Sequence, residues 1–265
     1  ARFYDPVIGR FGTIDRFSEK YYDMTPYQYG ALNPIKYIDV NGDSLLISHK
    51  GQDYLYQSGK LYQNGSEYTG KVKGFLKQTV NALGKISAGK EGSAMISELE
   101  GSKNNFTIVK SSSNSFVPDN TPASFANIPE IQAASGNSTS SLGSGGTINF
   151  NPSSGTSGLN TASNINRPSY IGLAHEMFHG RDSNQGVLYY GQNYTGATTG
   201  ITYQSTYQGL LKAEWRAVYY ENTVRGQSGL PLRTHYGIQQ TPNGPLPTGP
   251  RLLDVNNKPI NYQVR

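Results

Sequence analysis

Apolar and polar residues alternate with two different periods along the chain, and these periods predict where strands and helices lie. Residues 44–70 alternate in the manner of strands and are interrupted by Gly-containing pairs, which predicts two or three antiparallel strands. Residues 72–101 repeat apolar positions at helical spacing, and a break around Gly89 to Gly92 predicts two helices. The segments 104–112 and 145–152 each alternate like one strand. We therefore expect an α+β domain with a small mixed sheet.

The second half of the chain predicts two further helices among long loops. Residues 111–166 are rich in Ser, Asn, Thr and Gly, which predicts a loop-rich insert around the strand at 145–152. Pro168 suits the first turn of a helix that runs to about Gly180, and a second helix is expected over about 207–225. Residues 238–265 contain many prolines and are expected to form an extended tail with scattered strand.

The composition narrows the class of protein. The chain has 265 residues, enough for one catalytic domain and a small appendage. Its net charge is only +5 and its Lys and Arg residues form no block, so we expect no nucleic-acid partner. No apolar run approaches the about 20 residues of a membrane span, so we expect none. The absence of Cys excludes disulfides, thiolate zinc sites and Cys nucleophiles.

Residues 1–43 follow a pattern of their own. Aromatic residues, then Asp-Pro or Asn-Pro, then Gly recur in FYDPVIGRFGTID, TPYQYGALNPIKYID and VNGD, which predicts short strands closed by turns. This segment resembles the end of an RHS repeat-associated core. We therefore expect residues 1–43 to end such a core and residues 44–265 to form the variable C-terminal domain that follows it. Because the first residue is not Met, we also expect the chain to be a fragment of a longer protein.

The RHS resemblance also concerns two aspartates. In that family the core closes a β-cage, and two Asp motifs can release the C-terminal domain by self-cleavage. The matching residues here are Asp15 and Asp39. Neither is followed by the family's usual P-x-G-L, which argues against self-cleavage by this chain.

The strongest chemical signal is H-E-x-x-H within IGLAHEMFHGRD, residues 171–182. His175 and His179 lie one helical turn apart, about 6 Å, and can share one cation. Glu176 is rotated by about 100° from His175 and can reach a water on that cation as a general base. Several apolar neighbours predict that this helix is buried. The alternative is two hydrogen-bonded structural histidines, and we favour the metal site.

The motif leaves the third ligand open, because catalytic zinc normally has three protein ligands and a water. With only four His in the chain, the candidates are His49, His235 or a carboxylate. Asp182 is more typical of a helix cap or of a partner to a ligand. Glu214 is the better candidate, because a Glu on a largely apolar helix needs a partner. Glu221, two turns further on, is the runner-up ligand or an acceptor for a His N–H.

Four pieces of residues 145–237 together resemble the NleD-like (M91) zinc metallopeptidase effectors. They are GGTINFNP, NRPSYIGLAHEMFHG, AEWRAVYYEN and GLPLRTHY. The family pattern joins H-E-x-x-H to a downstream Glu, then E-N, then R-x-x-Y, and it also resembles clostridial neurotoxin light chains. The resemblance implies a zincin-like (gluzincin) fold in which His175, His179 and Glu214 bind Zn²⁺.

The same resemblance implies the catalytic roles. Glu176 would be the general base, and Arg233 and Tyr236 would stabilise the oxyanion of the transition state. Taken alone, an Arg and a Tyr three residues apart in a Tyr-rich chain carry little information. By analogy with other zincins, we also predict that the strand TINFN binds substrate as an added strand.

Joined to an RHS core, such a domain resembles a polymorphic toxin. The resemblance implies a zinc-dependent endopeptidase that is secreted or delivered into a target cell, cuts protein or peptide substrates and has an immunity protein. One alternative is a catalytically silent zincin-like or RHS-type module for binding or adhesion. A nuclease toxin is the third hypothesis, and the mild charge argues against it.

Overall fold

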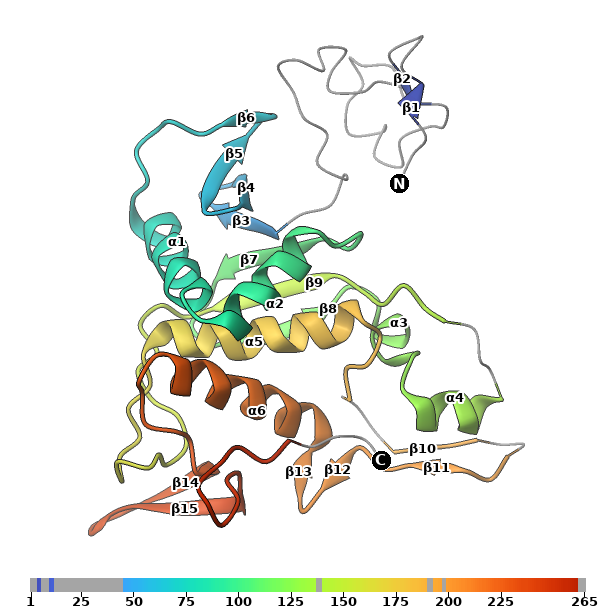
Figure 1. Cartoon of the computed structure of the whole chain (residues 1–265), viewed down its shortest axis with the longest axis vertical. Coiled ribbons are helices and arrows are strands. Elements are labelled where there is room, and N and C mark those ends of the chain that lie inside the picture. The colour runs from blue at the N-terminus through green and yellow to red at the C-terminus, as the bar shows by residue number, and fades with distance from the viewer. Residues whose placement is uncertain are drawn as a thin grey trace.

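The computed structural model describes residues 4–5, 10–11, 45–136, 140–189, 193–196 and 199–261. It has an α+β architecture in which helices cover a seven-stranded mixed sheet (Figure 1). The expected class and the mixed sheet are confirmed. Within the predicted RHS segment, the structure describes only β1 (Tyr4–Asp5) and β2 (Arg10–Phe11), which pair in antiparallel fashion. Asp15 and Asp39 lie outside the described residues.

The sheet has the strand order β6-β5-β4-β3-β7-β9-β8. One half is an antiparallel meander of β3 (Leu45–His49), β4 (Gln52–Gln57), β5 (Lys60–Gln63) and β6 (Ser66–Glu67). Its turns are two-residue pairs such as Lys50-Gly51, with φ of 54° and 75°, so the Gly-containing pairs of the sequence mark hairpins. The expected antiparallel pairing over 44–70 is therefore confirmed, with four strands instead of two or three.

The other half of the sheet contains parallel strands. β7 (Phe106–Lys110) lies parallel to β3, and β9 (Gly146–Phe150) lies parallel to β7. The edge strand is β8 (Ser115–Pro118), antiparallel to β9. Because both edges of β9 are already paired, the prediction that TINFN accepts a substrate strand is wrong.

Alternation within the strands decides which face of the sheet carries the core. Ile47, Ile108 and Ile148 are fully buried in a cluster with residues of α1 (Gly74–Ser87), α2 (Lys90–Glu100) and α5 (Ser169–Asn184). Their neighbours Thr107 and Thr147 point to the opposite face and are half-buried. The two helices expected over 72–101 are confirmed, with Gly89 as the N-cap of the second.

The loop-rich insert contains more regular structure than its composition predicts. It includes β8 and the short helices α3 (Thr121–Phe125) and α4 (Pro129–Ser135), besides the expected β9. The expected tail begins within a ribbon of β14 (His235–Thr241) and β15 (Gly244–Arg251), which projects from the body (Figure 1). Its prolines are tolerated because, within the described residues, β15 pairs with another strand on one side only.

The second predicted helix, α6 (Lys212–Gln227), begins later than expected. Residues 206–211 form two short strands, β12 (Thr206–Tyr207) and β13 (Leu210–Leu211), joined by a turn with positive φ at Gln208 and Gly209. A similar pair, β10 (Tyr194–Thr195) and β11 (Thr202–Tyr203), precedes them. The late start places Glu214 in the first turn of α6.

Helix α5 lies between the sheet and α6 (Figure 1). Every residue from Ile171 to Ser183 is buried, so this helix has no solvent-facing side over those residues. Phe178 stacks on Tyr220 of α6 at 4.8 Å, and the Asp182 carboxylate accepts two hydrogen bonds from Arg216 at 2.6 and 2.9 Å. These contacts fix α6 against α5. No described helix has the length and hydropathy of a membrane span.

Truncation of one buried side chain tests whether the hydrophobic core lies on only one face of the sheet. We expect Ile108→Ala to lower the free energy of unfolding by about 2–5 kcal/mol, because Ile108 is fully buried beneath the helices. The neighbouring control Thr107→Ala, on the opposite face, should cost no more than about 1 kcal/mol. Urea denaturation followed by circular dichroism measures both, and equal losses would contradict the assignment of the two faces.

Candidate metal centre

Two helices bring together the side chains of the candidate centre. His175 and His179 project from α5, and Glu214 projects from the first turn of α6. The potential ligand atoms of these three residues all lie within 4.8 Å of one another. The Nε2 atom of His175 is 3.0 Å from one Glu214 carboxylate oxygen, and the Nε2 atom of His179 is 3.4 Å from the other. The two histidines of the H-E-x-x-H motif and Glu214 therefore form one cluster.

The other candidate ligands lie elsewhere. Asp182 is occupied by Arg216. His49 packs against the ring of Phe75, and the Nδ1 atom of His235 contacts the hydroxyl of its neighbour Thr234. Among the described residues, no second group of His, Asp and Glu has metal-binding spacing.

The donor set suits zinc. Two imidazole nitrogens and one carboxylate oxygen leave a fourth position free in a tetrahedral site. His175 is only 5% exposed and His179 6%, so water competes little for these nitrogens. The Nδ1 atom of His175 lies 3.0 Å from Glu221, which keeps a proton on Nδ1 and leaves Nε2, on the side of Glu214, as the nitrogen that would bind a metal. The residues present therefore fit the metal that the motif implies.

The electric field at the centre also favours a cation. Burial alone would lower the pKa of His175, but its hydrogen bonds to Glu214 and Glu221 prevail and raise the pKa to about 10. Burial would raise the pKa of Glu214, but the neighbouring imidazoles hold it well below its usual range. A bound cation would take the place of the proton that these groups share.

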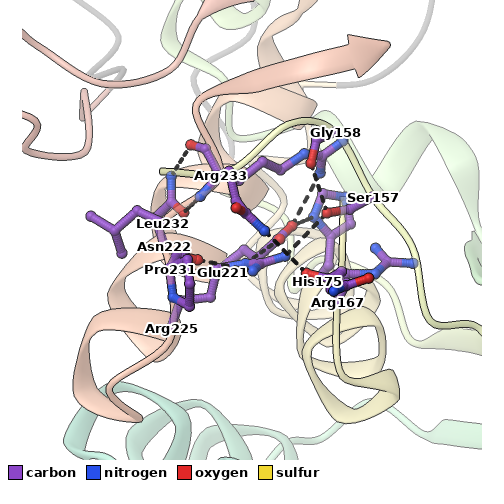
Figure 2. Close-up of polar contacts among 12 residues, drawn as sticks. Ser157, Gly158, Arg167, His175, Glu221, Asn222, Arg225, Pro231, Leu232 and Arg233 are labelled. Atoms are coloured by element: carbon purple, nitrogen blue, oxygen red, sulfur yellow. Dashed lines mark hydrogen bonds and ion pairs between the residues drawn. The ribbon is translucent and has the colours of Figure 1, made fainter. Parts of the chain in front are cut away.

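Glu221 is the acceptor for a histidine N–H, the second role that the sequence left open for it. Its carboxylate is fully buried. One oxygen accepts from Nδ1 of His175 at 3.0 Å and from Nη1 of Arg233 at 3.1 Å, and the other accepts from Nε of Arg225 at 2.8 Å (Figure 2). Burial opposes its ionisation, yet the charges of Arg233 and Arg225 hold the pKa of Glu221 well below the usual value.

The next residue, Asn222, holds the segment that carries R-x-x-Y. Its side-chain oxygen accepts from the backbone N–H of Arg233 at 2.7 Å, and its amide donates to the carbonyl of Arg233 at 3.0 Å (Figure 2). Arg225 adds a hydrogen bond to the carbonyl of Pro231 at 3.1 Å. The E-N pair of α6 therefore fixes both the His175 ring and the backbone of the R-x-x-Y segment.

The two residues expected at the oxyanion, Arg233 and Tyr236, have different positions relative to the metal-binding cluster. Nη1 of Arg233 donates to Glu221, and Nη2 donates to the carbonyl of Tyr236 at 2.6 Å, with the guanidinium 4.5 Å from the Tyr236 ring. Tyr236 itself lies beside Glu214. Burial and the Glu214 charge both raise the pKa of the Tyr236 hydroxyl, so it stays protonated and able to donate. Tyr236 thus reaches the centre, whereas Arg233 contacts it through Glu221.

Sequence reasoning missed two residues of this network, Arg225 and Asn222. The signal for Arg225 was its i, i+4 spacing from Glu221 on the same helix. Asn222 stood in the sequence as part of the E-N pair, but its partner is a backbone segment eleven residues away, which no spacing rule reveals.

Glu221→Gln tests the network. The substitution leaves the buried guanidinium groups of Arg225 and Arg233 without their carboxylate, so we expect a loss of about 3–5 kcal/mol in the free energy of unfolding. Zinc affinity should fall about 10–100-fold, because His175 loses the acceptor that orients it. Chemical denaturation and zinc titration measure these effects. The exposed Glu67→Gln is the control and should change neither, and a Glu221→Gln protein that matches it would contradict the account.

Comparison with known protein families gives a match. A family model, peptidase M91, described as an effector protein, matches residues 62–236. No curated protein matches the chain. The matched segment spans more than half of the chain and includes His175, His179, Glu214 and the E-N and R-x-x-Y segments. The chain therefore belongs to the peptidase M91 family of effector proteins.

Proposed function

We propose that this chain is a zinc-dependent endopeptidase of the gluzincin type. The family supplies the coarser statement, a peptidase-type effector. The observation that carries the finer proposal is the buried cluster of His175, His179 and Glu214, with ligand atoms within 4.8 Å, next to Glu176 on the same helix. Two histidines and a carboxylate with one open position are typical of catalytic zinc.

In this proposal each residue has one task. His175, His179 and Glu214 would hold the ion. When bound, zinc polarises the peptide carbonyl and lowers the pKa of water. Glu176 accepts the proton of the attacking water and returns it to the leaving amine.

Two further side chains serve the transition state. The Tyr236 hydroxyl donates a hydrogen bond to the carbonyl oxygen as it becomes negative. We assign Arg233 a positioning role instead of direct contact, since Nη1 and Nη2 are both already bonded. Through Glu221 it fixes the ring of His175, and through its Tyr236 contacts it fixes the donor.

The biological setting is part of the proposal. The resemblance of residues 1–43 to the end of an RHS core supports a C-terminal effector that is exported and delivered into a target cell. Its substrates would be proteins of that cell, and an immunity protein would protect the producer. The catalytically silent alternative gains no specific support from the geometry, because both the proposed base and the metal-binding cluster are present.

Glu176→Gln separates catalysis from metal binding. We expect the variant to keep one zinc per chain and to lose proteolysis about 10²–10⁴-fold, because only the proton acceptor is removed. Metal analysis and a proteome-wide cleavage screen against wild type measure the two properties, with the exposed Glu67→Gln as the matched control. Cleavage by Glu176→Gln at the wild-type rate would exclude Glu176 as the base.

Glu214→Gln tests the third ligand. Because an amide oxygen is a weaker ligand than a carboxylate, we expect this variant to lose stoichiometric zinc and all zinc-dependent cleavage. Equilibrium dialysis against zinc, followed by elemental analysis, provides the measurement. Retention of one zinc with unchanged affinity would move the third ligand to another carboxylate.

A further inference from the structure

Arg167 lies beside the proposed base. It directly precedes the N-cap of α5. Its Cζ and Nη2 atoms lie 3.2 Å from the position that a Cβ on Gly172 would occupy, so the guanidinium covers α5 at Gly172. Gly172 and Glu176 are four residues apart and share a helix face, and helical side chains lean toward the preceding turn. The side chain of Glu176 therefore leans toward Arg167.

The guanidinium of Arg167 has no carboxylate partner among the described residues. Four arginines elsewhere in the domain each have one: Arg181 pairs with Glu91, Arg216 with Asp182, and both Arg225 and Arg233 with Glu221. Arg167 donates one side-chain hydrogen bond, from Nη2 to the Ser154 hydroxyl at 3.2 Å. Its Nε atom is buried without a partner in the described structure. An N–H group that is buried without a partner is costly, and an anion bound to the guanidinium would offset that cost.

A second donor without a partner lies at the same place. The oxygen of the Asn114 side chain accepts from the backbone N–H of Asn151 at 2.7 Å, which fixes the amide so that Nδ2 faces Gly172. That Nδ2 atom is also buried without a partner among the described residues. A Cβ on Gly172 would collide with it, so glycine at this position leaves room for both donors.

The nearby carboxylates that the structure describes do not accept hydrogen bonds from Arg167 or Asn114. Glu221 already accepts from His175, Arg225 and Arg233. Glu176 forms no ion pair with Arg167 in the structure and is needed free as the base. Burial lowers the pKa of the Arg167 guanidinium. The negative charges of Glu221 and Glu176 oppose that shift, as expected for a guanidinium close to the centre. Arg167 is only half-buried, so its side chain remains accessible to a ligand.

We propose that Arg167, with Asn114 beside it, is the subsite for a carboxylate side chain of the substrate, an Asp or Glu next to the bond that is cut. This assignment rests on the proposed function, because it places the subsite beside Glu176. A guanidinium and an amide together supply the donors that a carboxylate binds best. The substrate class is thus a peptide segment with an acidic residue near the cleaved bond.

The experiment uses the zinc-loaded Glu176→Gln chain as a trap that holds peptides without cutting them. Peptides retained from a random library should be enriched in Asp or Glu at one position. In the trap that also carries Arg167→Gln, binding of acidic peptides should fall about tenfold, the effect of losing one charge-assisted hydrogen bond. Arg167→Lys should keep part of the preference, and Arg167→Glu should shift it toward Lys or Arg.

Controls separate recognition from folding. Lys77→Gln removes an exposed cation of α1 from the trap and should leave the enrichment unchanged. If the Arg167 variants fail to fold, the peptide side decides: replacing the enriched Asp by Asn should weaken binding to the unaltered trap about tenfold. No acidic enrichment, enrichment that survives Arg167→Gln, or indifference to that Asp→Asn change overturns the proposal.

A separate measurement distinguishes this inference from the proposed function. Wild-type protein is incubated with the peptides that the trap retains. Cleavage supports both ideas. Acidic peptides that bind through Arg167 but are never cut would sink the peptidase proposal and leave the subsite, whereas cut peptides without acidic preference would sink the subsite alone.

Discussion

The buried carboxylate of Glu221 is the constraint on which the rest of the centre depends. It is fully buried and accepts hydrogen bonds from His175, Arg225 and Arg233. An isolated carboxylate at this depth would be neutral, so the three donors and the carboxylate require one another. The consequence is that α5, α6 and the R-x-x-Y segment have one mutual position, which sets the direction of the His175 ring (Figure 2).

That arrangement also orders the charges from the core outward. Glu221 and its arginines form a closed inner group, and Asp182 with Arg216 closes a second one on the far turn of α5. What remains open is the outer side, where Glu214 faces two imidazoles and Arg167 faces no carboxylate among the described residues. The open groups are one site for a cation and one donor site for an anion, which suits a metal and an acidic peptide held side by side.

The features that were predicted correctly from the sequence are those that depend on residues close together in the chain. The hairpins around Gly51, the break at Gly89 and the face shared by His175 and His179 all follow from neighbours within a few residues. The start of α6 was misplaced because helix periodicity continued across a turn with positive φ at Gln208 and Gly209. The substrate strand was misassigned to residues 146–150 because alternation does not reveal that β8 covers their edge. Side-chain pairings across the fold, such as that of Arg233 with Glu221, depend on packing that no local pattern records.

The most direct test is a crystal structure of the zinc-loaded chain with anomalous data collected at the zinc absorption edge. We expect one zinc at about 2.0–2.2 Å from Nε2 of His175, Nε2 of His179 and a Glu214 oxygen, with an open fourth position. Glu221 would stay on Nδ1 of His175, away from the ion. An ion ligated by Glu221 or Asp182 instead of Glu214, or no anomalous peak between α5 and α6, would contradict the account.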